Sequence, residues 1–281
     1  MLDNQTIHQK NSEHYDAVVQ SWQILMGENF HWGYFNVPGM SLDDATIALI
    51  DLLAGFLNLH STHRVLDIGC GIGEPAMHLH QKYGCQVVGI SNSPKGIKTA
   101  NEIAEQRGLD SSVTFQLRDA LRNGFEDNSF DATWLMEMSH LIQDKEALIH
   151  EAARCVKPNG QIALCDLTFN RRPLPRDIFA NLENHKVLKR AFGEAQLETL
   201  EVYQSLFEDA GLTDIEILDI SSEVKPTLQH WKSNALHFLE DLKEPSQRTS
   251  LEDFAKSCDI LDVFYGDGTW GYGCVVGRKP H

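Results

Sequence analysis

The chain has 281 residues, of which 42% are hydrophobic and 23% charged, and this composition is that of a globular protein rather than a disordered or fibrous one. Its 24 basic and 40 acidic side chains give a formal net charge of −16, so nucleic acids and anionic membrane surfaces are not expected partners. Six cysteines without a Cys-x-x-Cys pair indicate reduced thiols, and the polar N-terminus lacks a signal peptide. With no apolar run long enough to span a bilayer, these features predict a cytoplasmic protein.

Residues 11–60 have the apolar spacing of helices, with an aromatic, glycine-containing loop at 29–35 between them. From residue 64 the pattern changes to short apolar runs that alternate with helical segments. Strands are expected at 64–69, 85–90, 113–119, 130–136 and 161–167, and helices at 75–83, at 94–107 and after Asp144. Because strands that alternate with helices pair in parallel, this region predicts a sheet covered by helices on both faces.

The regular alternation ends after the fifth predicted strand. Residues 170–196 are polar and helix-like, which indicates an insertion rather than a crossover helix. A helix at 198–210, a strand at 215–220, a long helical stretch at 226–258 and a last strand at 270–277 follow. The last two strands, separated by a long excursion, predict an antiparallel pair at the sheet edge. The expected fold is therefore an α/β, doubly wound sheet of seven strands.

A glycine-rich turn, Asp67-Ile-Gly69-Cys-Gly71-Ile-Gly73, connects the first predicted strand to a helix. Glycines let the backbone approach a ligand closely, and the N-terminus of the following helix offers free N–H groups to it. The spacing is GxGxG, and Glu74 stands where a dinucleotide-binding loop has its third glycine. Asp67 would repel a pyrophosphate but suits a cationic amine, so the loop favours S-adenosylmethionine over NAD. The alternative is an ordinary corner between a strand and a helix.

Several segments together resemble the class I S-adenosylmethionine-dependent methyltransferases. Within them the chain is similar to the small-molecule branch with the tocopherol, sarcosine/dimethylglycine and macrolide or indolocarbazole methyltransferases. The segments that carry the resemblance are 65–75, 87–94, 118–120, 125–141, 156–167 and 271–279, together with the loop at 29–35. The resemblance implies a Rossmann-like fold in one domain, 1–281. Its parts would be an N-terminal helical lid (1–63), a cofactor-binding core (64–168), a substrate-covering insertion (169–197) and the C-terminal part of the sheet (198–281).

The same resemblance implies a role for each residue of the core motifs. Gly69, Gly71 and Gly73 would pass close to the methionine part of S-adenosylmethionine, and Asp67 would help to hold its amine. Many relatives have an acid after the second strand that binds the ribose, and here Ser91 is the candidate in its place. Asp119 would accept a hydrogen bond from the adenine amino group, with Ala120 offering its backbone N–H. A solvated acid at the strand end is the alternative for Asp119.

The candidate catalytic residues stand at the carboxyl ends of the fourth and fifth strands, where doubly wound sheets bind ligands. His140 aligns with a histidine that relatives use near the acceptor, and an imidazole can remove a proton near neutral pH. Asp166 could orient that imidazole or hold the substrate, and Glu137 interrupts an apolar run in which a carboxylate needs a partner. The alternatives are a partly exposed histidine in a helical turn and a strand-end cap.

Two further groups of residues are predicted to contact the acceptor. The insertion has six basic and two acidic residues between 170 and 190, which suggests that arginines bind an anionic acceptor group. Aromatic residues near the N-terminus would close over the cofactor and acceptor, with Trp32 near the sulfonium. The candidate acceptor residues are Arg171, Arg172, Arg176, Tyr15, His31 and Tyr34. A solvated helix face and ordinary helix packing are the alternatives, and no metal site is expected.

The predicted activity is methyl transfer from S-adenosylmethionine to a small molecule of secondary metabolism. O-methylation is favoured because a histidine base is present, followed by C-methylation of a prenyl diphosphate and N-methylation of an amine. Two other hypotheses are a non-catalytic cofactor-binding subunit and a dinucleotide-dependent oxidoreductase. The sequence leaves the acceptor and the oligomeric state open, a homodimer being one alternative.

Overall fold

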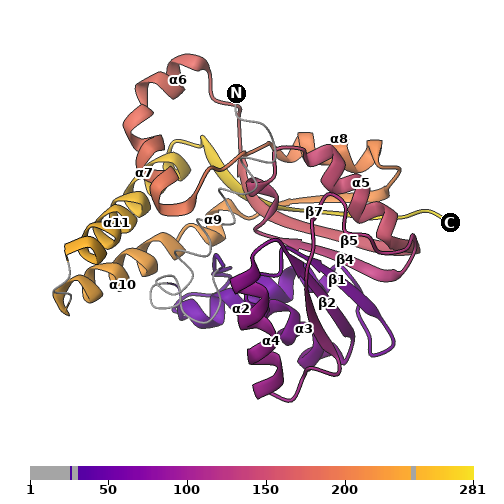
Figure 1. Ribbon diagram of the computed structural model, residues 1–281. Coiled ribbons are helices and arrows are strands. Elements are labelled where there is room, and N and C mark those ends of the chain that lie inside the picture. Colours follow the sequence, from indigo (N-terminus) through magenta and orange to yellow (C-terminus); the bar gives the residue numbers. More distant parts are fainter. Residues whose placement is uncertain (1–25, 27–30, 242–244) are drawn as a thin grey trace.

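The computed structural model describes Met26 and residues 31–241 and 245–281. A seven-stranded sheet with the order β3-β2-β1-β4-β5-β7-β6 crosses the molecule (Figure 1). Its strands are β1 (Arg64–Ile68), β2 (Gln86–Ser91), β3 (Val113–Leu117), β4 (Phe130–Met136), β5 (Val156–Phe169), β6 (Thr213–Asp219) and β7 (Trp270–Arg278). Strands β1 to β5 pair in parallel, whereas β7 is antiparallel to both β5 and β6. The predicted α/β sheet with an antiparallel pair at one edge is confirmed.

Helices pack on both faces of this sheet, and others form a lobe beyond the carboxyl ends of its parallel strands (Figure 1). The helices are α2 (Leu42–Gly55), α3 (Glu74–Tyr83), α4 (Pro94–Gln106), α5 (Lys145–Cys155), α6 (Pro175–Ala180), α7 (Leu182–Phe192), α8 (Leu200–Asp209), α9 (Ser221–Val224), α10 (Thr227–Asp241) and α11 (Pro245–Gly266), with the 3₁₀ turn η1 (Ser139–Leu141). Helices α5 and α8 cover one face, on a core that includes Leu148 and Phe207. Leu49 and Met77 of α2 and α3 belong to the core on the other face.

Local signals in the sequence fix several of these helix ends. The side chain of Ser41 accepts a hydrogen bond from the backbone N of Asp44 and so caps α2, as its position predicts. Asp144 caps α5 in the same way through the backbone N of Ala147. Gly84, with a φ of 71°, ends α3.

Two boundaries differ from the sequence-based expectation. The chain passes from α5 directly into β5 at Val156, so the strand expected at 161–167 begins five residues earlier and extends to Phe169. The helical stretch expected at 226–258 is divided into α10 and α11, and α11 extends to Gly266. The division has a simple cause, because Pro245 can begin a helix but cannot continue one.

The lobe consists of α7, α10 and α11, which pack on one another (Figure 1). The first of these helices belongs to the predicted insertion, and the other two connect β6 to β7. Residues from this lobe and from the carboxyl ends of the central strands line one common cavity. In the part of the chain that the structure describes, no helix combines the length and the apolar character needed to span a bilayer.

Candidate functional site

A cavity of about 520 Å³ lies where the carboxyl ends of β1, β2, β4 and β5 meet the lobe. One end is lined by the glycine turn, by residues 91–93 after β2 and by residues 118–120 after β3. The other end is lined by His31, Trp32, His140 and side chains of α7, α10 and α11. The crevice at the carboxyl ends of the strands is the usual ligand site of doubly wound sheets, so this cavity is the candidate active site.

Two glycines of the turn between β1 and α3, Gly69 and Gly73, have no room for a side chain. Gly69 has a φ of 84°, and a Cβ built on it would lie 2.5 Å from the Cβ of Met138. Gly73 has a φ of 87°, and a Cβ there would overlap the ring of Phe115. Both positions therefore require glycine on two grounds, the left-handed backbone and the lack of space. The backbone of the turn forms the cavity wall directly, and α3 begins behind it at Glu74.

Asp67 lies beneath this turn and does not line the cavity. Its side chain is only 2% exposed, and its Oδ2 atom is buried without a hydrogen-bond partner. Burial raises the pKa of Asp67 from 3.8 to about 7, although the charge of His31 acts in the opposite direction. A buried carboxyl with an unsatisfied oxygen next to a cavity has unused capacity for a cationic partner.

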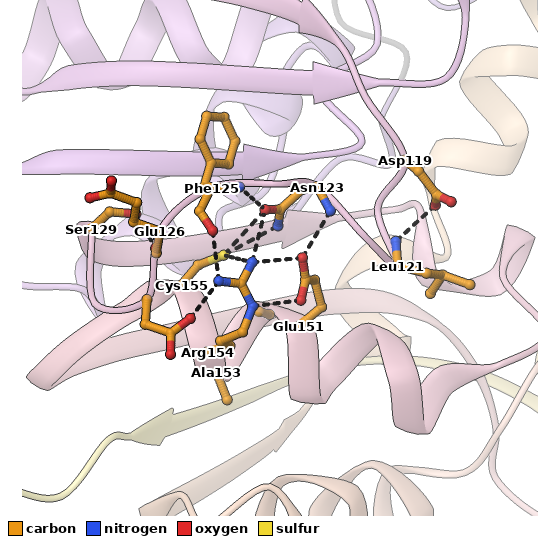
Figure 2. A network of polar contacts seen from close by, with 12 residues as sticks. Asp119, Leu121, Asn123, Phe125, Glu126, Ser129, Glu151, Ala153, Arg154 and Cys155 are labelled. Atoms are coloured by element: carbon orange, nitrogen blue, oxygen red, sulfur yellow. Dashed lines mark hydrogen bonds and ion pairs between the residues drawn. The ribbon is translucent and has the colours of Figure 1, made fainter.

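The residues predicted at the far end of the cofactor site line the cavity. Ser91 accepts a hydrogen bond from the backbone N of Ser93 at 3.2 Å. Asp119 is exposed, and its Oδ1 accepts the backbone N of Leu121 at 2.9 Å, which fixes the turn that presents Ala120 (Figure 2). The second carboxylate oxygen of Asp119, Oδ2, does not take part in this hydrogen bond.

Arg154 of α5 holds the segment that follows this turn (Figure 2). Its guanidinium donates to both carboxylate oxygens of Glu151 at 2.8 Å, and also to the carbonyl of Phe125 at 2.6 Å and the carboxylate of Asp127 at 2.7 Å. The backbone N of Asn123 donates to Glu151 at 2.8 Å. One arginine thus connects the loop after β3 to the helix below it, so the loop is anchored although it contains no regular secondary structure.

His140, which lines the cavity, is paired with the buried carboxylate of Asp166. Nδ1 of His140 lies 2.7 Å from Oδ1 of Asp166, and the backbone N of His140 donates to Oδ2 at 2.9 Å. The Asp166 side chain is fully buried, whereas that of His140 is 13% exposed and faces the cavity. Burial alone would raise the pKa of Asp166, but the charge and hydrogen bonds of His140 and the Ser139 hydroxyl lower it below its usual value. Asp166 is therefore ionised at neutral pH and accepts the hydrogen on Nδ1.

Glu137 occupies the turn after β4 with a φ of 50°, which is unusual for a residue other than glycine. Its Oε1 accepts the backbone N of Trp32 at 2.9 Å and the hydroxyl of Tyr272 at 2.7 Å, and its Oε2 lies 3.4 Å from Nδ1 of His31. The carboxylate thus connects the loop at 31–35 to the sheet. These contacts anchor the loop, and because Glu137 also lines the cavity its catalytic role stays a prediction.

The loop at 31–35 is fixed by more than this carboxylate. The backbone N–H groups of residues 32–35 each donate to a different element, namely to Glu137 after β4, Thr227 of α10, Ala45 of α2 and Glu223 of α9. The Trp32 ring is buried and contacts the rings of Trp231, Tyr265 and Tyr272 at 5.1–6.1 Å. The loop therefore forms a fixed wall of the cavity.

A family profile described as a methyltransferase domain matches residues 66–164. The chain is 34% identical, over 267 residues, to 27-O-demethylrifamycin SV methyltransferase of Amycolatopsis mediterranei (strain S699), and the match covers 95% of each chain. It is 32% identical to norajmaline N-methyltransferase of Rauvolfia serpentina over 64% of each chain. The chain belongs to the S-adenosylmethionine-dependent methyltransferases.

Among solved structures, that of the [4+2]-cyclase SpnF superposes on this methyltransferase with a TM-score of 0.81. The two chains are 24% identical, and the match covers 97% of this chain and 96% of the cyclase. This likeness shows the common fold, which is the Rossmann-like fold expected from the sequence. Relatives named for transfer to oxygen and to nitrogen show that membership alone does not fix the acceptor atom.

The methyltransferase has residues that fit its methyl donor. The backbone of the glycine turn lines the cavity directly, the orphaned Oδ2 of Asp67 suits an ammonium group, and Asp119 lines the same cavity. A Cβ on Gly96 would lie 3.0 Å from Oγ of Ser93 and 3.2 Å from the carbonyl oxygen of Gly71, so α4 packs closely against the glycine turn.

Four further residues predicted to contact the acceptor do not line the cavity, namely Arg171, Arg172, Arg176 and Tyr34. Arg171 pairs with Asp177, Arg172 with Glu198 and Arg176 with Asp177, and the three arginine side chains are 56–82% exposed. The structure therefore does not support the expectation that these arginines bind the acceptor, because carboxylates of the insertion and its flank already bind their guanidinium groups. Tyr34 packs against the core beside the cavity. Tyr15 lies outside the described residues.

Several cavity residues were not predicted. The walls opposite the cofactor half include His185 and Leu188 of α7, Trp231 of α10, Leu261 of α11 and Trp270 at the start of β7. Their spacing along the chain carries no motif, since they come from three helices and a strand that meet only in the folded lobe. Helical periodicity alone would place most of these apolar residues in an ordinary core.

Proposed function

We propose that this methyltransferase transfers a methyl group to a hydroxyl of a mainly apolar small molecule, with His140 as the general base. The observation that carries the proposal is the His140–Asp166 pair, in which the imidazole lines the cavity and the carboxylate is buried behind it. A hydroxyl must lose its proton as its oxygen is methylated, and an imidazole held by a carboxylate is suited to accept it.

Each group of residues in the site has a separate role in the proposed reaction. When bound, S-adenosylmethionine supplies an electrophilic methyl group on a sulfonium. Asp166 keeps the hydrogen of His140 on Nδ1, which leaves the lone pair of Nε2 available to the acceptor. With the donor bound, His140 would take the hydroxyl proton at Nε2 as the acceptor oxygen receives the methyl group. The fixed loop at 31–35 and the lobe hold the acceptor and exclude water, and this positioning supplies much of the rate.

The acceptor half of the cavity favours an uncharged, mainly apolar molecule. Aromatic and aliphatic side chains of α7, α10 and α11 form its walls. Among the described lining residues the cations are Arg118 and Lys189. Arg118 lies at the cofactor end and donates to Gln116 and Asn123, and Lys189 pairs with Glu194 at 2.8 Å. Neither cation forms a site for a diphosphate or a carboxylate.

The positions of the cations in and around the cavity distinguish the two alternatives, C-methylation and N-methylation. C-methylation of a prenyl diphosphate would require cations near the acceptor, and the arginines predicted for that role lie elsewhere. N-methylation of a neutral amine remains the second candidate, since His140 could accept a proton from an ammonium. The six cysteines are free and buried, which agrees with an enzyme of the reducing cytoplasm.

The proposal is tested by a panel of acceptors of matched size. Purified protein and S-adenosylmethionine are incubated with neutral macrocyclic polyols, phenols, aliphatic amines and prenyl diphosphates, and products are identified by mass spectrometry. We expect methylation only of hydroxyl-bearing, uncharged molecules. Methylation of an amine or a prenyl diphosphate, with hydroxyl compounds inert, would contradict the proposal. Failure of S-adenosylhomocysteine to bind in calorimetry would contradict the placement of the cofactor in this cavity.

A further inference from the structure

We propose that Lys145, Ser139 and Tyr203 are positioning residues that fix His140 on its carboxylate partner. The proposal rests on the proposed function, because it matters only if His140 is the base, but its test needs no acceptor. None of the three residues lines the cavity. They belong to α5, η1 and α8, so three separate elements converge behind the catalytic turn.

The ammonium group of Lys145 closes the turn that carries His140. Its Nζ donates to the carbonyl oxygen of Ser139 at 2.9 Å and to that of Ile142 at 2.6 Å. These two carbonyls flank His140 in the chain. Lys145 therefore joins the two ends of a short 3₁₀ turn, which has few backbone hydrogen bonds of its own.

The position of Lys145 is unfavourable for a cation for two reasons. It is only 6% exposed, and it is the first residue of a helix, where the helix dipole disfavours a cation. Burial lowers its pKa to about 8, although the charges of Asp166 and Glu198 act to raise it. A residue that contradicts its local environment indicates a tertiary or functional requirement. The requirement visible in the structure is the pair of carbonyls on either side of His140.

Tyr203 is connected to Asp166 through the hydroxyl group of Ser139. The Ser139 hydroxyl donates to Oδ2 of Asp166, and the Tyr203 hydroxyl lies 2.7 Å from the oxygen of Ser139. Burial and the Asp166 charge raise the pKa of Tyr203 well above 10, so its hydroxyl stays protonated. Ser139 donates its hydroxyl hydrogen to Asp166, so the Tyr203 hydroxyl donates to the oxygen of Ser139. This bond strengthens the hydrogen bond from Ser139 to Asp166.

These contacts complete the set of donors around the carboxylate. Oδ2 of Asp166 accepts from the Ser139 hydroxyl and the backbone N of His140, while Oδ1 accepts from Nδ1 of His140 and the backbone N of Leu167. With each oxygen bound twice, the plane of the carboxylate is fixed. The plane in turn determines the ring orientation and tautomer of His140.

The exchange of the Nδ1 proton of His140 with water reports directly on this arrangement. It is measured by nuclear magnetic resonance on histidine-labelled protein saturated with S-adenosylhomocysteine, and the signal is assigned by its loss in His140→Gln. The test variants are Tyr203→Phe, which removes one hydroxyl, and Lys145→Met, which removes the ammonium but keeps an unbranched side chain.

Two matched controls remove the same groups elsewhere. Tyr265→Phe removes a buried hydroxyl that donates to the carbonyl of Gly271 at 3.1 Å. Lys279→Met removes an ammonium that donates to the carbonyls of Ala153 and Val156 at 2.8 and 2.9 Å. Neither residue contacts the His140–Asp166 pair.

We expect exchange to accelerate about tenfold or more in both test variants and to change less than about twofold in the controls, as the loss of one buried hydrogen bond predicts. The affinity for S-adenosylhomocysteine should stay within about threefold in all four proteins, because the network lies outside the cofactor half. Unchanged exchange in folded Tyr203→Phe protein would overturn the proposal, and this variant alone decides if Lys145→Met does not fold. Equal acceleration in the controls would also overturn it. Loss of activity in His140→Ala tests the base itself and is independent of this outcome.

Discussion

Asp166 accepts two hydrogen bonds from His140, one from the ring at 2.7 Å and one from the backbone at 2.9 Å. The side chain and the main chain of one residue thus bind both oxygens of a single carboxylate. The ring cannot rotate away without breaking the first contact, and the turn cannot shift without breaking the second. His140 is therefore held in place before any acceptor enters the cavity.

Replacement of either member of this pair separates catalysis from cofactor binding. We expect His140→Ala to lower kcat about 100-fold or more, because a positioned general base contributes about this factor. Asp166→Asn keeps the volume but removes the carboxylate, so its effect should be of a similar order. Calorimetry with S-adenosylhomocysteine should give affinities within about threefold of the parent for both. An undiminished kcat in His140→Ala would remove the histidine from its proposed role.

Asp67 predicts a pH dependence of cofactor binding. With its pKa raised from 3.8 to about 7, the folded protein without ligand keeps a proton on Asp67 that the unfolded chain has already lost. The free energy of unfolding should therefore fall as the pH rises from about 4 to 7. An ammonium-bearing ligand favours the ionised carboxylate, so the affinity for S-adenosylhomocysteine should be about tenfold higher at pH 8 than at pH 6.

Calorimetry at the two pH values measures this difference, and Asp67→Asn is the matched control. The variant has no carboxyl to titrate, so its affinity should be weaker and nearly constant with pH. If the parent protein shows the same flat profile as the variant, Asp67 does not face the amine of the cofactor.

Arg154 should contribute to both stability and cofactor affinity, because it anchors the loop that presents Asp119 (Figure 2). We expect Arg154→Ala to lower the free energy of unfolding by about 2 kcal/mol and to weaken S-adenosylhomocysteine binding several-fold. Arg190→Ala is the control, since Arg190 pairs with both oxygens of Asp253 on an exposed surface and should contribute less than about 1 kcal/mol. Denaturant unfolding and calorimetry measure the two effects. Equal losses in the two variants would show that the loop needs no anchor.

Variants of Glu137 test whether its carboxylate only anchors the loop at 31–35 or also takes part in catalysis. Glutamine can still accept hydrogen bonds from Trp32 and Tyr272, so Glu137→Gln should keep most of the turnover, whereas Glu137→Ala releases both donors. Hydrogen exchange of the Trp32 backbone amide should accelerate about tenfold in the alanine variant and little in the glutamine variant. A glutamine variant that retains the protected amide but loses turnover would instead assign chemistry to the carboxylate.

The sequence predicts the sheet and its cofactor edge well because both depend on local patterns. Gly69, Gly73 and Asp67 are close in the chain, and the strands on either side have continuous apolar runs. The proximity of His140 and Asp166 was also predictable, since His140 follows one predicted strand, Asp166 lies near the end of the next, and parallel strands end at the same edge. The contact of Asp166 with the imidazole, one of the two roles expected for this carboxylate, is present, but the additional bond from the backbone N of His140 depends on the geometry of η1 and was not predicted.

The acceptor half was predicted poorly for a physical reason. Arg171, Arg172 and Arg176 stand out by charge, but a charged side chain is stable on the surface and pairs with nearby carboxylates. Trp231 and Leu261, which do line the cavity, resemble ordinary core residues until the lobe is assembled. Lys145 was also missed, because nothing in its local sequence shows that it is buried.

The most direct test of the account follows the transferred carbon itself. S-adenosylmethionine labelled with ¹³C in its methyl group is supplied to the parent protein and to His140→Ala with an accepted substrate, and the product is examined by nuclear magnetic resonance. The account predicts that the label appears on oxygen, and that the variant forms this product at least about 100-fold more slowly while binding S-adenosylhomocysteine as the parent does. Label on nitrogen or carbon, or an equally fast variant, would contradict it.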